Sequence, residues 1–528
     1  MERLELLVAL LAAVAVVVRL AGRSLIPEPV LLVLAGLGVA LIPGLPEVEL
    51  DPDLILALFL PPLLYWAALH TDSGELRRNL RPIVVLAVGL VLVTTAAVAV
   101  LAHSVFGMPW AVAVVLGAIV SPPDPVAATS VAGRLGLPRR MVAILEGEGL
   151  LNDATALVLY RLAVAAAVSG TFSIGDAGVE LVLASVGGTA VGLAVGLAGS
   201  RILRQVSEAP VENTVKLLLP YVAWLAAERV HVSGVLAVLA CGLLMSRHWG
   251  SISSGARLQA RQLWDWLVFV LEGLSFVLIG VQLRTVVEGI EGRSLADLAV
   301  AALVLNLVVI VVRLALVYPV SWLPRLSARV RERDPFPGWA WVTVIGWAGM
   351  RGVVSLALAL AIPTQVEGGG PFPDRNLVVF LAFSVIVVTL VGQGLTLPLV
   401  IRRLGVGTDD DGAAGDGRRA LARLSQVALD HLDAVDPEAD GVPPELVERL
   451  RERYRARLAH LAQQRRQDGD GQPDGSRAYA ELVHDLLGTQ REELRRLREQ
   501  GAVTPEVARR LDHDLDAEEA RLERERPG

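Results

Sequence analysis

Residues 117–131 read GAIVSPPDPVAATSV, and this stretch decides how the chain around it can fold. Three prolines, Pro122, Pro123 and Pro125, surround Asp124 inside a long apolar run. Because proline has no amide hydrogen and its ring clashes with the preceding turn, one continuous helix across these residues is excluded. Broken helices are tolerated inside a membrane where they line a cavity, and their free carbonyl groups and helix ends can bind ions. A simple kink beside an acid that reaches toward water is the alternative, but it does not explain an aspartate at the break itself.

The composition of the whole chain indicates a membrane protein. It has 528 residues, of which 53% are hydrophobic and 20% are charged. Apolar runs of about 20 residues recur along most of the chain, which is the length that crosses a hydrocarbon core of about 30 Å. Runs such as 4–18 and 32–42 do not alternate apolar and polar residues, so helices rather than barrel strands are expected. The predicted fold class is an all-α polytopic membrane protein.

About 13 membrane-spanning helices are expected. Their predicted bounds are 4–21, 28–43, 53–70, 82–104, 109–134, 140–168, 177–200, 213–229, 232–247, 261–284, 295–322, 338–362 and 376–402. Among the connections between these helices, those that follow odd-numbered helices hold most of the arginines, namely Arg23, Arg77, Arg78, Arg81, Arg139, Arg140, Arg201, Arg204, Arg257, Arg325, Arg329, Arg331 and Arg333, whereas Arg284 and Arg293 are exceptions. The positive-inside rule then places the N-terminus outside and the C-terminal tail in the cytoplasm, across a plasma membrane.

A change of composition divides the chain into a transmembrane domain, 1–405, and a charged tail, 406–528. Thr408–Gly528 contain 20 basic and 28 acidic residues, so the acidic balance comes from the tail and no nucleic-acid partner is expected. Amphipathic charged stretches, the last of which begins at Thr504, predict a helical cytoplasmic tail. A tail that only pairs with itself or a neighbour and a tail that regulates the protein both fit this sequence.

A second segment, ILEGEGLLNDATALVLYR at 144–161, concentrates charge within a predicted helix. Glu148 and Asn152 lie four residues apart and share one helix face, and Asp153 lies about 100° further around. Ionisable groups in the middle of a membrane helix cost about 2.5–3.5 kcal/mol each, so they are functional candidates. Burial favours the neutral form of a carboxyl group, whereas a nearby cation favours its charged form. Such a carboxylate holds a proton or a metal ion but not both, which is the chemistry of an exchanger.

The expected partner of these acids is Arg351, which lies between glycines in GWAGMRGVVSLALALAIP at 346–363. We predict an ion pair between Glu148 and Arg351, because an unpaired buried charge costs about 3–5 kcal/mol. Glu272 and Arg313 also fall in predicted membrane helices and are candidates for a second structural pair.

Three motifs, PDPVA at 123–127, EGEGLLNDATALV at 146–158 and GMRGVVSLALAL at 349–360, together resemble the monovalent cation–proton antiporter superfamily, in its sodium–proton exchanger branch. The resemblance extends over about residues 1–405 in motif order and helix number. It implies inverted repeats of helices 1–6 and 8–13, in which helices 5 and 12 are broken and cross. It also implies a homodimer formed through an outer scaffold and an elevator-like movement of the core.

The same resemblance assigns roles to residues at matching positions. It implies that Asp153 is the principal carboxylate for the ion and the proton, and that Asp124 is its partner across the break. Asn152 stands where the electrogenic branch has a second acid, which implies exchange of one cation per proton with no net charge moved. Glu148 and Arg351 are implied to form the stabilising ion pair.

Two positions depart from the pattern of many relatives. Pro123 replaces a threonine before the aspartate of the break, and Gly149 replaces a serine four residues before the principal aspartate. The backbone carbonyl of Pro123 can still bind the ion, but two hydroxyl ligands are lost. Thr129 and Ser130 lie nearby in the sequence, although nothing in it places them at the ion. Sodium is the expected cation, and potassium becomes a more credible alternative.

The predicted function is secondary antiport of Na+ or Li+ against H+ for pH and sodium homeostasis, with K+/H+ antiport as the alternative. The chain is expected to be no enzyme and to need no cofactor apart from the transported ions. An intramembrane aspartyl protease would also use two membrane aspartates, but no second aspartate lies in a Gly-rich helix motif. The expected partners are the lipid bilayer, monovalent cations, protons and a second copy of the chain.

Overall fold

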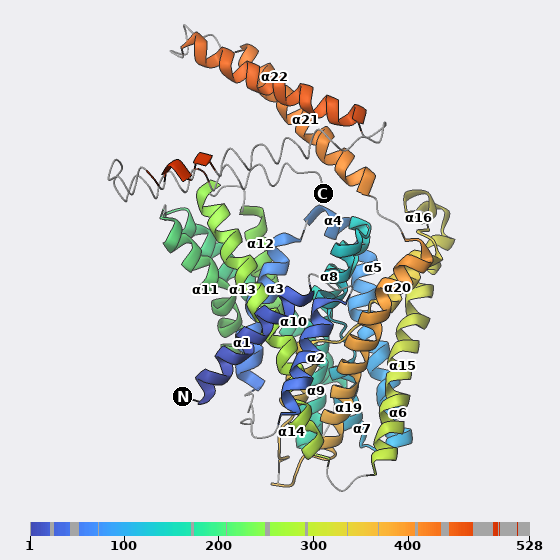
Figure 1. Ribbon diagram of the computed structural model, residues 1–528. Helices are drawn as coiled ribbons and strands as arrows, with labels where there is room; N and C mark the ends of the chain where they lie inside the picture. The colour runs from blue at the N-terminus through green and yellow to red at the C-terminus, as the bar shows by residue number, and fades with distance from the viewer. Residues whose placement is uncertain are drawn as a thin grey trace. The chain divides into compact units, whose positions relative to one another are not determined.

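The structure of the protein is a computed structural model (Figure 1). It describes residues 2–21, 26–42, 52–71, 73–170, 174–206, 208–248, 254–290, 294–334, 336–367, 369–406, 410–434 and 443–467, together with 489–490, 492–494, 496 and 515. Contacts divide the chain into two units, Met1–Asp409 and Asp410–Gly528. Arg23, Arg293 and, apart from Leu515, the helix predicted from Thr504 lie outside the described residues.

The described residues of the first unit form helices, and the only extended pairing among them is an isolated bridge between Gln365 and Pro371. The helices are α1 (Glu2–Ala21), α2 (Glu28–Ala40), α3 (Pro52–His70), α4 (Ser73–Arg78), α5 (Leu80–Val84), the π-helix η1 (Val85–Leu90), α6 (Val91–Phe106), α7 (Trp110–Val120), α8 (Pro125–Leu135), α9 (Arg139–Ser169), α10 (Ile174–Leu203), α11 (Ala209–Arg229), α12 (Gly234–His248), α13 (Ser254–Val281), α14 (Leu283–Glu288), α15 (Leu295–Trp322), the 3-10 helix η3 (Leu323–Leu326), α16 (Ala328–Arg333), α17 (Trp339–Trp347), α18 (Val353–Leu360), α19 (Arg375–Val387), the π-helix η4 (Val388–Gln393) and α20 (Gly394–Leu404). The predicted all-α fold class is confirmed.

Every segment that the sequence predicts as a membrane helix falls on one or more of these helices. In the described part of the chain, seven helical segments are long and apolar enough to cross a membrane, namely Leu80–Phe106, Trp110–Val131, Arg140–Ser169, Gly178–Leu203, Gln259–Glu288, Leu295–Leu326 and Arg375–Leu404. Shorter apolar helices are Val8–Ala21, Glu28–Ala40, Leu56–His70 and Gly234–Arg247. The number of crossings, about 13 from the sequence, therefore stays a prediction.

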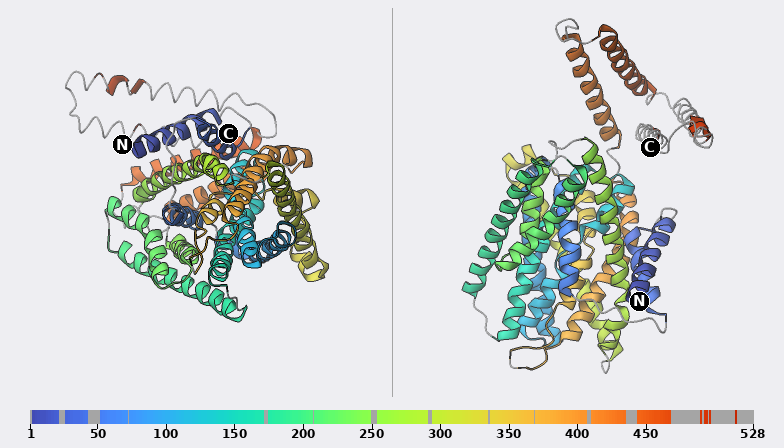
Figure 2. Two further views of the ribbon diagram at one scale, coloured as in Figure 1. Left: turned by 90° about the horizontal axis from the view of Figure 1, so that it is seen from below. Right: turned by 90° about the vertical axis from the view of Figure 1, so that its left-hand side faces the viewer.

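Helices of the first unit pack in groups. α10, α11 and α12 pack on one another and α12 contacts α3, whereas α6, α7, α9 and α15 form another group, and α2 packs along α13. The end-on view in Figure 2 shows α10–α12 and α15 on different sides of the bundle. Small residues let the helices approach closely. A side chain at Gly36 of α2 would overlap the main chain of Val277 in α13, and one at Gly192 of α10 would overlap that of Ala237 in α12.

Two helices are broken where the sequence predicts breaks. The chain leaves α7 at Val120 and resumes as α8 at Pro125, and it leaves α17 at Trp347 and resumes as α18 at Val353. Prolines explain the first break, because each removes a backbone donor. Glycines on both sides of Arg351 favour the second, because they lower helix propensity. The predicted breaks in helices 5 and 12 are confirmed.

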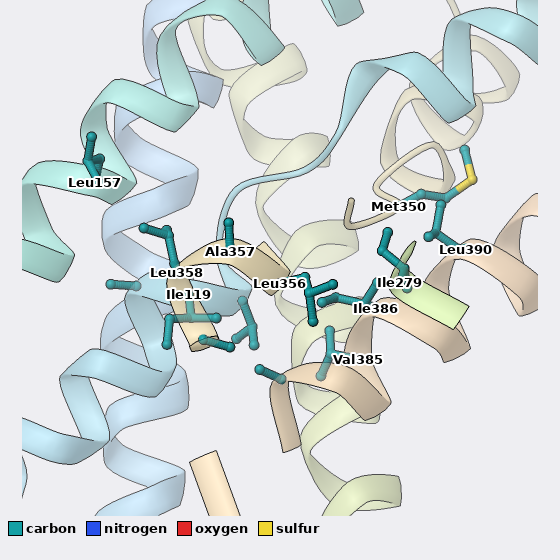
Figure 3. Packing of buried hydrophobic residues seen from close by; sticks show 14 of the residues in the cluster. Ile119, Leu157, Ile279, Met350, Leu356, Ala357, Leu358, Val385, Ile386 and Leu390 are labelled. Atoms are coloured by element: carbon teal, nitrogen blue, oxygen red, sulfur yellow. The ribbon is translucent and has the colours of Figure 1, made fainter. Parts of the chain in front are cut away.

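Apolar side chains from distant segments surround the second break (Figure 3). Ile279 of α13 lies beside Met350, which is in the unwound segment, and beside Leu390 of η4. All three side chains are buried, as is Leu356 of α18. The surroundings of the break are therefore apolar, and every polar group within them needs a partner.

The second unit contains α21 (Asp410–Ala434) and α22 (Pro444–Gln467), which pack against each other. Arg451 of α22 donates a hydrogen bond of 2.9 Å to the carbonyl oxygen of Leu432 and lies 3.0 Å from a carboxylate oxygen of Asp433. These contacts join the end of α21 to the start of α22.

Candidate functional site

The two unwound segments, 121–124 and 348–352, lie against each other and form what we term the crossing. The amide of Asp124 donates a hydrogen bond of 2.6 Å to the carbonyl oxygen of Met350. A side chain at Gly352 would overlap the Asp124 carboxylate, so glycine is needed for this close approach. The crossing thus joins the segment that carries Asp124 to the segment that carries Arg351.

The Asp124 carboxylate lies at the N-terminal ends of two half-helices. Its Oδ1 accepts a 2.9 Å hydrogen bond from the amide of Val126, in the first turn of α8. It also lies against Gly352, which immediately precedes α18. The free amide groups and the dipole of a helix N-terminus stabilise a negative charge. These backbone groups favour the charged form of Asp124, whereas the burial of its side chain disfavours that form.

Arg351 lies at the opposite, C-terminal ends of the half-helices. Its Nε donates a 3.0 Å hydrogen bond to the carbonyl oxygen of Val120, the last residue of α7, and Nη1 donates to that of Gly349. A cation is favourable there, because the last carbonyl groups of a helix have no partner within it. The crossing therefore has one charged side chain for each kind of helix end.

α9 contacts the crossing through Asn152. Asn152 is fully buried, and its Nδ2 donates a 2.7 Å hydrogen bond to the carbonyl oxygen of Pro123. Within the described part of the chain, Asn152 Oδ1 has no hydrogen-bond partner. The Pro123 carbonyl oxygen therefore already accepts one hydrogen bond, and its second lone pair is available to a cation.

Asp153 is the next residue of α9, directly after Asn152. Its side chain is buried, and among the described residues none donates a hydrogen bond to its carboxylate. The Asp124 carboxylate is near enough to interact with it electrostatically. The structure thus brings together Asp153, Asp124, Asn152 and Pro123, the residues that the sequence predicts for the ion site. Their contact with an ion stays a prediction.

The ion pair predicted between Glu148 and Arg351 is wrong, because Glu148 pairs with Arg313 of α15. Arg313 Nη1 lies 2.6 Å from Glu148 Oε1, Nη2 lies 3.1 Å from Oε2, and both side chains are only 1% exposed. The guanidinium also donates to the carbonyl oxygens of Gly346, at 3.1 Å, and Ile345, at 3.2 Å. Arg313 thus makes four hydrogen bonds, two of them to the Glu148 carboxylate, whereas Arg351 donates to carbonyl groups at the crossing.

The second pair considered from the sequence, Glu272 with Arg313, is wrong for the same reason. Arg313 uses both terminal nitrogens on Glu148, and Glu272 lies half-buried on α13. A side chain at Gly349 would overlap the Arg313 guanidinium, so this glycine makes room for the observed pair.

Packing explains one of the two departures noted in the sequence. A side chain at Gly149 would overlap the ring of Pro125, so no serine fits there without a shift of the crossing. The hydroxyls of Thr129 and Ser130 donate to the carbonyl oxygens of Val126 and Ala127 in their own helix, at 3.2 and 2.9 Å. They are thus engaged within α8.

Thr389 of η4 contacts the crossing, and the sequence did not reveal it. Its Oγ1 accepts a 3.0 Å hydrogen bond from the amide of Arg351 and donates one of 2.7 Å to the carbonyl oxygen of Val385. A threonine in an apolar helix has no charge and belongs to no motif. Its polarity at membrane depth was the only available signal.

Comparison with known proteins gives consistent matches over most of the chain. A family model described as sodium/hydrogen exchanger, transmembrane, matches residues 6–403. An uncharacterized Na+/H+ exchanger of Mycobacterium tuberculosis (strain ATCC 25618 / H37Rv) is 38% identical over 532 residues, covering 98% of this chain and 96% of that protein. A sodium, potassium, lithium and rubidium/H+ antiporter of Bacillus pumilus (strain SAFR-032) is 33% identical over 412 residues, covering 75% of this chain and 61% of that protein.

A solved structure has a similar fold. The sodium proton antiporter MjNhaP1 from Methanocaldococcus jannaschii, at pH 8, superimposes with a TM-score of 0.59 at 19% sequence identity. The superposition covers 76% of this chain and 99% of that one. At this identity the likeness concerns the arrangement of helices.

Proposed function

Because the chain belongs to the sodium/hydrogen exchanger family, we propose that it exchanges Na+ for H+ at a site formed by Asp153, Asp124 and Asn152. The proposal rests on the buried and unpaired carboxylate of Asp153. Its carboxylate is buried on α9, receives no hydrogen bond from the described residues, and lies on the helix next to Asn152, whose amide oxygen is also without a partner. Unpaired oxygen atoms gathered at a helix break are suited to binding a cation.

In the proposed cycle, Asp153 binds either a cation or a proton. A carboxylate in an apolar, membrane-spanning site is costly unless a proton or a cation neutralises it. Carboxylate and carbonyl oxygens suit hard cations, so Asp153, Asp124 and Asn152 offer ligands to Na+. A proton on Asp153 removes the charge that holds the cation. Access to the site from alternate sides of the membrane then yields antiport.

We propose one cation per proton. Asn152 offers a neutral oxygen where a second acid would add a titrating charge. Asp124 accepts a backbone hydrogen bond at a helix N-terminus, which supports a carboxylate that stays charged through the cycle. Only Asp153 then alternates between a bound cation and a bound proton, and no net charge crosses the membrane.

The protein spans a membrane several times. The kind of membrane, the orientation of the chain in it and the oligomeric state are part of the same proposal. We place it in a plasma membrane as a homodimer, with the N-terminus outside and the tail in the cytoplasm, where it supports pH and sodium homeostasis. The distribution of arginines between the two sets of connections supports this orientation. The inverted repeat and an elevator-like movement of the core remain part of the proposal.

Potassium is the second candidate cation. Pro123 and Gly149 contribute no hydroxyl to the site, and packing against Pro125 excludes a side chain at Gly149. A Bacillus pumilus relative is named for sodium, potassium, lithium and rubidium exchange. Broader selectivity than sodium alone is therefore a specific alternative.

Everted vesicles that contain a pH-sensitive dye test the proposal. Addition of Na+, Li+ and K+ in turn should restore the dye fluorescence for each ion that is exchanged for protons. Asp153→Asn is expected to abolish the response, because an amide cannot alternate between a proton and a cation. Asp297→Asn is the matched control, because Asp297 is exposed in the first turn of α15.

Each outcome has a defined meaning. Dequenching with Na+ in the wild type that Asp153→Asn removes and Asp297→Asn retains would support the proposal. Normal exchange by Asp153→Asn would overturn the site. A response to K+ alone would identify potassium rather than sodium as the exchanged cation. A rate that changes with an imposed membrane potential would contradict one-for-one exchange.

A further inference from the structure

Glu272 of α13 is an acid at membrane depth that takes no part in the crossing. Its side chain is half-buried, and within the described part of the chain no residue forms a hydrogen bond or an ion pair with it. Arg313, the partner considered from the sequence, binds Glu148 instead. A carboxylate in such surroundings is costly unless a proton or a cation neutralises it, so its presence needs a reason.

The face of α13 that carries Glu272 is turned toward the crossing. Ile279 lies seven residues further along, which is two helical turns, so the two side chains share one face. Ile279 lies beside Met350 of the crossing (Figure 3). Ser275 and Phe276, which lie between them on this face, are only 1% and 3% exposed. Glu272 therefore faces the interior of the bundle, two turns nearer than Ile279 to the start of α13.

The charged groups that act on Glu272 are acids. Asp124 at the crossing and Glu28 in the first turn of α2 both interact with it electrostatically. Among the described residues, no basic side chain does so. Asp124 in turn interacts with Asp153. Glu28, Glu272, Asp124 and Asp153 thus form a series of neighbouring acids that leads from the start of α2 to the ion site.

The inner end of this series offers oxygen atoms to a cation. Asn152 is fully buried, and its Oδ1 has no hydrogen-bond partner within the described part of the chain. The adjacent Asp153 carboxylate likewise receives no hydrogen bond from the described residues. Charges of one sign between walls of low dielectric focus the electric field and raise the local concentration of counter-ions. The series of acids therefore draws a cation inward to ligands that lack a donor.

We propose that Glu272 is the entry residue of the exchange site: its carboxylate attracts the cation on the side of the membrane where α2 and α13 begin and passes it to Asp124 and Asp153. The distribution of arginines makes that side the cytoplasm. The inference rests on the function proposed for the Asp124–Asp153 site. Glu272 takes no part in the alternation between cation and proton. Its charge sets how readily the cation reaches the site.

Glu272→Gln tests the proposal in full-length protein, because glutamine keeps the shape of the side chain and removes the charge. In everted vesicles, which present the cytoplasmic face, the KM for Na+ should rise about ten-fold, while the maximal rate stays within about two-fold. In right-side-out vesicles, where Na+ meets the other face, the KM should change by less than about two-fold. Glu272→Asp, which retains the charge, should restore the KM in everted vesicles.

Glu208→Gln is the matched control. Glu208 is exposed, precedes α11 and makes no side-chain cap hydrogen bond. In the proposed orientation it lies on the cytoplasmic side, so this variant removes one negative charge from the same side without changing α13. Its KM and maximal rate should equal those of the wild type. The melting temperature of Glu272→Gln in detergent should not fall, because its carboxylate accepts no hydrogen bond from the described residues.

Three results would overturn the role of Glu272. An unchanged KM in Glu272→Gln would show that the residue stays protonated, because glutamine resembles a neutral glutamic acid. An equal rise of the KM from both faces would make Glu272 a ligand within the ion site, and a lower melting temperature or a failure to fold would make it structural. Failure of the proposed function appears separately, as exchange that survives Asp153→Asn.

Discussion

At the residue scale, the two arginines near the crossing bind different groups. Arg313 binds the Glu148 carboxylate through two nitrogens, and Arg351 binds the carbonyl ends of half-helices. The planar, forked guanidinium suits both tasks, whereas a lysine ammonium would satisfy fewer acceptors. Glu148 and Asp153 lie on the same helix, so the Glu148–Arg313 pair also anchors the helix that carries the candidate ion carboxylate.

Replacement of Arg313 by methionine should leave Glu148 as an unpaired buried charge. The free energy of unfolding is expected to fall by about 3–5 kcal/mol, which thermal unfolding in detergent would detect. The double variant Glu148→Gln with Arg313→Met should recover part of the loss, because no charge remains buried alone. A single variant as stable as the wild type would show that the pair is not required.

At the element scale, close helix contacts depend on individual glycines. α2 contains two glycines that are separated by a single residue. A Cβ at Gly36 would overlap the main chain of Val277 and Gly280 in α13, whereas one at Gly38 would meet no atom within 4 Å. The same amino acid therefore has opposite roles at the two positions. Contact with α13 requires Gly36, and Gly38 only weakens the helix.

Gly36→Ala should separate α2 from α13 and lower the free energy of unfolding by about 1–3 kcal/mol, as overpacking does. Gly38→Ala in the same helix should be neutral or stabilising by up to about 1 kcal/mol, because alanine has the higher helix propensity. Unfolding curves of the two variants, recorded side by side, check the difference. Equal effects would contradict the close contact.

At the scale of the first unit, an ion pair joins two groups of helices. Arg161 of α9 lies 2.7 Å from Glu228 of α11, and their side chains are 42% and 35% exposed. α9 packs mainly with α7 and η1, while α11 packs with α10 and α12. A conversion that moves the α9 group against the α11 group must break this pair.

Arg161→Gln with Glu228→Gln is expected to change stability by less than about 1 kcal/mol, because the pair is exposed. It should change the exchange rate by up to about five-fold and reduce its dependence on ionic strength, because salt screens exposed charges. Vesicle assays at several salt concentrations measure both effects. Arg284→Gln with Glu288→Gln is the control, since that pair lies within one helix at 43% and 47% exposed. A change of rate in the control as large as in the first variant would refute the interpretation.

The sequence by itself determined the fold class, the broken helices and the residues that gather at the crossing. Each of these follows from chemistry within one segment. Apolar runs of membrane length require helices, prolines around Asp124 prevent a continuous helix, and helical spacing places Asn152 and Asp153 near Glu148. Such local rules need no knowledge of how distant segments pack.

The tertiary structure alone decided which charges meet. Glu148 and Arg313 lie 165 residues apart. The sequence analysis paired Glu148 with Arg351 and Glu272 with Arg313, and nothing in the charges themselves distinguishes these pairings from the observed one. The choice depends on the depth and rotation of α15 and α17 relative to α9, which no local pattern contains. Packing of Gly149 on Pro125 and the electrostatic interaction of Glu272 with Asp124 are likewise properties of side chains that meet only after folding. Partner choice in an apolar interior follows from three-dimensional geometry, because charge and polarity alone allow several pairings.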